Sequence, residues 1–133
     1  MSRDLKSVLV IDDEYFIRES FADFFDDNLW KTFQAGNGEE ALALLEQESP
    51  RGALVDIRMK GMNGDVFIRE AFKRYPGLVY VICTGTPLYD VPPDLVKIPQ
   101  VSNRVFQKPV PSLFELEEEL FRLIKQFDEG KIE

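Results

Sequence analysis

Short apolar runs alternate with amphipathic segments along most of the chain. The apolar runs are rich in β-branched residues, which predicts strands that are buried on both faces; they are 6–11, 30–35, 52–55, 78–83 and 104–107. The segments between them repeat apolar residues at steps of three and four, which predicts helices; they are about 14–27, 37–48, 64–74 and 113–127. Because such an alternation produces right-handed crossovers, we expect an α/β fold, a three-layer sandwich around a parallel sheet of five strands.

One stretch departs from this alternation. Residues 85–103 contain Pro87, Pro92, Pro93 and Pro99. A proline inside a helix costs about 3 kcal/mol. The fourth crossover is therefore predicted to be a long loop that holds a short helix near 93–98.

Composition limits the chemistry that this chain can perform. The chain has no histidine and one cysteine, Cys83. These counts exclude histidine-ligated zinc, Ser-His-Asp triads and an internal disulfide. Cys83 is expected to be a small buried core residue rather than a reactive thiol.

Length, charge and hydropathy indicate the class of protein. The 133 residues suit a single domain, 1–133, with a core at about 5–127 and a tail or linker stub at 128–133. A net charge of −8 argues against nucleic-acid binding. No apolar run is long enough to span a membrane, and residues 1–6 lack the apolar stretch of a signal peptide. We expect a cytoplasmic protein.

Polar residues with phosphate or metal chemistry follow four of the five predicted strands. Asp12 and Asp13 end the first strand, Asp56 the third, Thr84 the fourth and Lys108 the fifth. The carboxyl ends of parallel strands meet at one edge of a sheet, where ligands bind. The sequence therefore predicts that these side chains gather in one site.

The negative charge of three carboxylates in one site must be compensated. Two unit charges about 4 Å apart repel by roughly 4 kcal/mol at an effective dielectric of 20. Oxygen ligands without histidine or cysteine favour a hard cation, and Mg²⁺ needs only a few carboxylates. Lys108 would offset a phosphoryl oxygen, and the Thr84 hydroxyl would donate a hydrogen bond to another. Asp56 is then placed as a carboxylate nucleophile.

Five motifs in this order carry a resemblance to a known family. They are Val8–Glu14, Ala35–Leu42, Asp56–Gly64, Cys83–Gly85 and Lys108–Pro109. From about Leu5 to Phe127 the chain resembles a receiver domain of the two-component response regulator family. The resemblance implies a flavodoxin-like sheet with strand order 2-1-3-4-5.

The resemblance also implies a role for each residue. Asp56 would accept a phosphoryl group from a phosphohistidine on a sensor histidine kinase or histidine phosphotransfer protein. Asp12, Asp13 and Asp56 would bind Mg²⁺ with the backbone carbonyl of Arg58. Thr84 would move toward the phosphoryl group, and Lys108, before a cis bond to Pro109, would pair with it. Such a domain assists its own phosphorylation and dephosphorylation, catalyses no other reaction, and regulates a partner or output domain that the sequence does not identify.

Two departures from the family pattern leave an alternative open. Lys60 stands where many members carry proline, and Val105 stands where the usual switch aromatic lies. Phe106 is expected to point to the opposite face of its strand. The alternative is a phosphorylation-independent interaction module on the same fold. A haloacid-dehalogenase-type phosphatase is disfavoured, because Arg58 stands where a second aspartate would act.

Simpler structural roles compete with these functional ones. Asp12 and Asp13 could cap the first helix. Trp30 is expected in packing or at a partly exposed edge. The acidic run 115–119 is expected to be the solvated face of the last helix at its favourable dipole end, with an acidic docking surface as the alternative.

Overall fold

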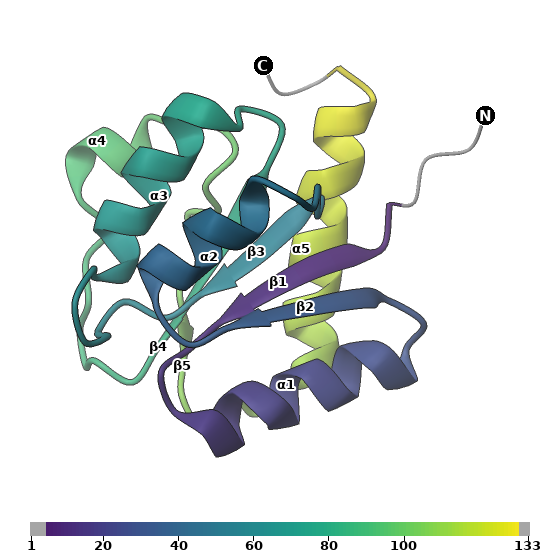
Figure 1. The fold of residues 1–133 in the computed structure, drawn as a ribbon, viewed down its shortest axis with the longest axis vertical. Helices are drawn as coiled ribbons and strands as arrows, with labels where there is room; N and C mark the ends of the chain where they lie inside the picture. Colours follow the sequence, from purple (N-terminus) through teal and green to yellow (C-terminus); the bar gives the residue numbers. More distant parts are fainter. Residues whose placement is uncertain (1–4, 131–133) are drawn as a thin grey trace.

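A computed structural model of the protein describes residues 5–130. Its five strands form one parallel sheet in the order β2-β1-β3-β4-β5, as predicted (Figure 1). The strands are β1 (Ser7–Ile11), β2 (Lys31–Ala35), β3 (Gly52–Val55), β4 (Val79–Thr84) and β5 (Phe106–Gln107). The four pairings between neighbouring strands are all parallel.

Helices cover both faces of the sheet and complete the three predicted layers (Figure 1). They are α1 (Tyr15–Asp27), α2 (Gly38–Leu45), α3 (Gly64–Arg74), α4 (Pro93–Val96) and α5 (Leu113–Asp128). Helices α1 and α5 pack on one face, and α2, α3 and α4 pack on the other. Among residues 5–130, no helix is long and apolar enough to cross a membrane.

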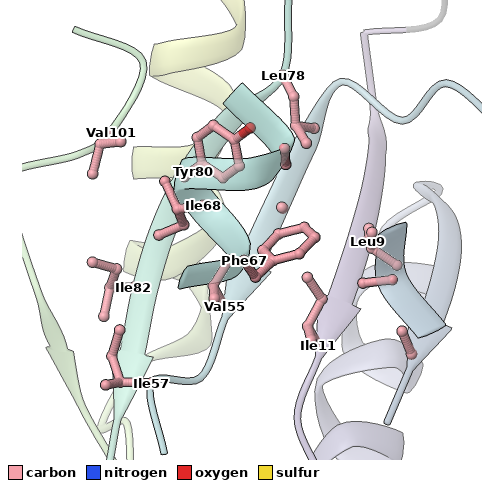
Figure 2. Close-up of a cluster of buried hydrophobic side chains, with 14 of the residues drawn as sticks. Leu9, Ile11, Val55, Ile57, Phe67, Ile68, Leu78, Tyr80, Ile82 and Val101 are labelled. Atoms are coloured by element: carbon pink, nitrogen blue, oxygen red, sulfur yellow. The ribbon is translucent and has the colours of Figure 1, made fainter. Parts of the chain in front are cut away.

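Two hydrophobic clusters, one on each face, hold the layers together. Successive residues of β1 alternate between them, because side chains of a strand point to opposite faces: Leu9 and Ile11 face α2 and α3, whereas Val8 and Val10 face α1 and α5. Figure 2 shows the first cluster, in which Phe67 of α3 lies over the sheet.

Three elements differ from the sequence prediction by two residues or more. Helix α2 ends at Leu45, and two consecutive amide groups beyond it, those of Glu46 and Gln47, bond three residues back, which tightens the turn and ends the helix. Strand β5 is shorter than predicted, because only Phe106 and Gln107 pair with β4; Val101 forms a separate isolated bridge with Tyr80. Helix α4 is a short helix in a proline-rich loop, as expected, but ends at Val96.

The C-terminal helix corrects two expectations. Glu119 is not solvated: it is 9% exposed and accepts hydrogen bonds from Ser102 and Arg122. Asp128 ends α5 rather than starting a tail, and its carboxylate lies 3.1 Å from the Arg51 guanidinium. The last part of the predicted tail, 131–133, lies outside the described residues. Packing against neighbouring loops therefore orders positions that the charge pattern assigned to solvent.

Candidate functional site

The predicted site residues lie at the carboxyl edge of the sheet. Backbone hydrogen bonds continue the strand ladders past the strand ends and fix three of them in place. The amide of Asp12 donates to Ala35 O (3.2 Å), that of Asp56 to Ile11 O (3.0 Å), and that of Lys108 to Thr84 O (2.8 Å). The sheet therefore sets the spacing between these side chains.

Three carboxylates meet at this edge. Asp12, Asp13 and Asp56 each offer an oxygen, and these oxygens all lie within 4.8 Å of one another. Asp12 and Asp56 are buried at 2% and 5% exposure, whereas Asp13 is exposed. Neither Asp12 nor Asp13 is the N-cap of α1, which is Glu14. The two aspartates therefore lie in the carboxylate cluster and are not the cap of the helix.

Lys108 is the cation of the cluster. Its ammonium nitrogen lies 2.8 Å from Asp12 Oδ2 and 3.5 Å from Asp56 Oδ2. Burial opposes its charge, but the hydrogen bond to Asp12 and the nearby carboxylates hold the pKa of Lys108 above its usual value. One ammonium group therefore contacts two of the three carboxyl groups.

Burial and the uncompensated negative charge of the cluster raise the pKa of Asp56. Burial first, and then the charge of Asp12, raise the pKa of Asp56 from 3.8 to about 6, although Lys108 opposes the shift. A divalent cation would offset the repulsion between the carboxylates, and an all-oxygen donor set suits Mg²⁺. The residues present therefore fit the ion that the sequence predicts.

A cavity of about 290 Å³ opens over Asp56. Thr84, Thr86, Lys108 and Arg58 are among the residues that line it. Thr84 is fully buried, and its hydroxyl accepts a hydrogen bond from the backbone amide of Thr86 (3.1 Å). The hydroxyl proton of Thr84 is therefore available to a ligand in the cavity.

Gly64 closes the loop behind the cluster. Its amide donates to Ile57 O (2.8 Å), which turns the chain back so that α3 starts directly beneath the strand end. A Cβ at position 64 would overlap the carbonyl oxygen of Asp56. Only glycine allows this close approach.

Val105 and Phe106 point to opposite faces of the sheet, as expected. Val105 packs on the side of α2, α3 and α4, and Phe106 is buried on the side of α1 and α5. The bond from Lys108 to Pro109 is cis, which is also as expected.

An apolar groove of about 530 Å³ adjoins the cavity. Phe16, Ile17 and Phe21 of α1 form one wall, and Pro109 and Leu113 lie on the other. Phe16 is 85% exposed. The groove and the cavity share Glu14, Gly85 and Lys108, so a partner seated in the groove would reach the cluster.

Sequence reasoning missed two polar side chains that support the site. Arg18 donates to the backbone carbonyl of Asp12 (2.9 Å) and to Gln34 of β2 (3.1 Å). Gln107 donates to the carbonyl of Thr84, at the end of β4, and to that of Thr86, in the loop that follows. Arg18 lies in the first turns of the helix that follows the acidic pair, which could have signalled it, whereas no local pattern marks Gln107.

Comparisons with known proteins agree with this geometry. Residues 8–110 match the family model described as the response regulator receiver domain. The chain is 37% identical over 59 residues to sporulation initiation phosphotransferase F of Bacillus subtilis (strain 168), a match that covers 44% of this chain and 48% of that protein. A receiver domain protein (CheY-like) from Methanospirillum hungatei JF-1 has a similar structure, with a TM-score of 0.78 and 26% identity over 94% of this chain and 98% of that one.

A third similar protein is much longer than this chain. It is the protein-glutamate methylesterase/protein-glutamine glutaminase of Pyrococcus horikoshii, which is 36% identical over 65% of this chain but only 24% of its own length. The chain thus spans about half or less of the curated relatives named here.

Proposed function

The chain belongs to the response regulator receiver domain family, and on that premise we propose that Asp56 accepts a phosphoryl group and so switches the domain between two signalling states. The observation that carries the proposal is the meeting of Asp12, Asp13, Asp56 and Lys108, from three different strand ends, at the edge of a cavity that Asp56 and Lys108 line. Carboxylates and an ammonium in that arrangement suit phosphoryl transfer, which depends mainly on positioning and charge.

Each residue has a distinct task in this proposal. Asp12, Asp13 and Asp56, with the backbone carbonyl of Arg58, would hold Mg²⁺, which when bound supplies positive charge against the phosphoryl oxygens. Lys108 neutralises a further oxygen, and the Thr84 hydroxyl donates a hydrogen bond.

The proposed transfer exchanges one bond to phosphorus for another. An Asp56 carboxylate oxygen attacks the phosphorus of a phosphohistidine, and the P–N bond breaks. The electron pair leaves with the imidazole nitrogen, and the product is an acyl phosphate. Water later attacks the same phosphorus, which releases inorganic phosphate and regenerates the Asp56 carboxylate. The domain thus assists its own phosphorylation and dephosphorylation.

The proposed phosphodonor is a sensor histidine kinase or a histidine phosphotransfer protein. The 133 residues contain no histidine, so they cannot themselves supply the phosphohistidine. The apolar groove along α1 supports this proposal, because it runs into the cavity and exposes Phe16. A partner docked there would bring its phosphohistidine to Asp56.

A second candidate function is a phosphorylation-independent interaction module. Val105 favours it, because no aromatic residue stands there to link the site to the surface. The two functions differ in the response to beryllofluoride, an analogue of the phosphoryl group, with Mg²⁺. A switch changes amide NMR signals beyond the cavity, whereas a static module changes only those that line it.

Intact-mass spectrometry tests the proposed phosphorylation. Incubation with acetyl phosphate and Mg²⁺ should add one phosphoryl group to the wild type. The addition should fail in EDTA and in Asp56→Asn, but not in Asp65→Asn, a carboxylate on α3. Labelling that survives Asp56→Asn would assign the phosphoryl group elsewhere and overturn the proposal.

A further inference from the structure

Gln107 bridges the last strand to the loop that carries Thr84. Its side-chain amide nitrogen donates to the carbonyl of Thr84 (3.1 Å) and to that of Thr86 (3.2 Å). Gln107 lies directly opposite Thr84 in the pairing of β4 with β5. One side chain therefore ties together two backbone groups on either side of Gly85.

The same loop is closed a second time by Thr84 itself. The Thr86 amide donates to the Thr84 hydroxyl oxygen (3.1 Å), which leaves the hydroxyl proton free for the cavity. If residues 84–86 changed conformation, the Thr86 amide would leave this oxygen, and the hydroxyl would lose its fixed direction. The two bonds from Gln107 oppose that change.

We propose that Gln107 is a positioning residue, which holds the loop 84–86 so that the Thr84 hydroxyl points its proton at a phosphoryl group on Asp56. This proposal rests on the proposed phosphorylation of Asp56. Gln107 does not touch the reacting atoms, since its contacts are with loop carbonyls. Its amide group acts as a double donor, so the proposal depends on donation and not on side-chain size.

Gly85 lies between the two residues whose carbonyls Gln107 bridges, and it has no side chain that could hold the loop. The nearest heavy atom to a Cβ built at Gly85 is Lys108 Cε, at 4.0 Å, so packing leaves this position open. Hydrogen bonds from Gln107 therefore substitute for the packing that holds other parts of the site.

Three substitutions separate donation from charge and size. Gln107→Met keeps the length and removes the donors, Gln107→Glu also removes the donors and adds negative charge, and Gln107→Lys retains donors and adds positive charge. Gln47→Met, at an exposed glutamine just after α2, is the matched control.

Two readouts are needed. Hydrogen exchange of the Thr86 amide, measured by NMR without Mg²⁺ or phosphodonor, reports the loop alone. It should accelerate about five-fold in Gln107→Met and Gln107→Glu but not in Gln107→Lys or the control. The rate of Asp56 phosphorylation by acetyl phosphate should fall about three- to ten-fold in the same two variants. The affinity for Mg²⁺ should stay that of the wild type in Gln107→Met.

Several results would overturn the proposal. One is that Gln107→Met changes neither the exchange rate of the Thr86 amide nor the phosphorylation rate. A second is that Gln107→Met and Gln107→Lys change these rates equally, which would show that donation is not needed. A third is that Gln107→Glu and Gln107→Lys change them in opposite directions while Gln107→Met has no effect, which would show that charge alone matters. A wild type that accepts no phosphoryl group would refute the proposed function, and Thr86 exchange would still decide whether Gln107 holds the loop.

Discussion

The ammonium group of Lys108 lies 2.8 Å from a carboxylate oxygen of Asp12, although 96 residues separate the two in the chain. Both side chains are nearly buried, with exposures of 10% and 3%. A buried ion pair of this kind adds little net stability, but removing one partner leaves an uncompensated charge. Lys108 thus compensates the negative charge of the buried carboxylates in the folded protein.

Lys108→Met should destabilise the domain in the absence of Mg²⁺. The substitution leaves Asp12 and Asp56 without their buried cation, which we expect to cost about 2–4 kcal/mol at pH 7.5. Urea unfolding with and without Mg²⁺ measures the loss, and Mg²⁺ should recover part of it. Lys97→Met, at an exposed lysine after α4, is the control. Equal stability of the two variants would show that Lys108 does not compensate the cluster.

Asp56→Asn should stabilise the metal-free domain at neutral pH. The folded-state pKa of Asp56 is about 6 against 3.8 as the usual value. A raised pKa means that this carboxyl group favours folding below pH 3.8 and that the contribution is lost as the pH rises through about 6. The variant should gain about 2 kcal/mol over the wild type at pH 7.5 and lose the advantage near pH 4. A difference that does not change with pH in urea unfolding would contradict this cause.

Removal of Mg²⁺ should lower the thermal stability of the wild type. A cation that binds only the folded state stabilises it by mass action. We expect 10 mM Mg²⁺ to raise the melting temperature by about 3–6 °C and EDTA to reverse the shift. Asp13→Asn should abolish most of it, because Asp13 belongs to the cluster. Asp23→Asn, at an exposed position of α1, should retain it. A full shift in Asp13→Asn would remove that residue from the proposed ligands.

Gly64→Ala should damage the fold at the site more than an ordinary helix substitution. The added Cβ overlaps the carbonyl oxygen of Asp56 and contacts Val55, both on the sheet. We expect a loss of about 2–4 kcal/mol, since neither group can move without disturbing β3. Gly36→Ala, whose nearest contact is the Arg18 side chain at an ordinary 3.4 Å, is the control. Equal losses of stability in the two variants, measured by thermal unfolding, would argue against a close approach between Gly64 and the carbonyl of Asp56.

Cys83 should not react in the folded protein. Burial raises the pKa of the Cys83 thiol from 9.0 to about 12, so little thiolate exists near neutral pH. Iodoacetamide at pH 8 should modify it only after addition of denaturant, which mass spectrometry detects. Rapid labelling of the native protein would show that β4 opens easily at this position.

The local sequence pattern is sufficient to predict the layers of this fold and the place of the site. Alternating apolar runs and amphipathic segments predict the layers, because burial on two faces and burial on one face impose different spacings. The polar residues after the strands predict the site, because parallel strands place their carboxyl ends at one edge. The roles of those residues stay proposals that the experiments above decide.

Other features depend on contacts between residues that are distant in the sequence. The pairing of Lys108 with Asp12, the burial of Glu119 against Ser102, and the donation from Gln107 to Thr84 follow from how strands and helices pack. The charge pattern alone assigned Glu119 to solvent, and nothing in it marked Gln107. Periodicity along the chain decides which side of an element faces the core. The tertiary structure decides which polar groups meet there, since hydrogen bonds require positions that only the assembled layers define.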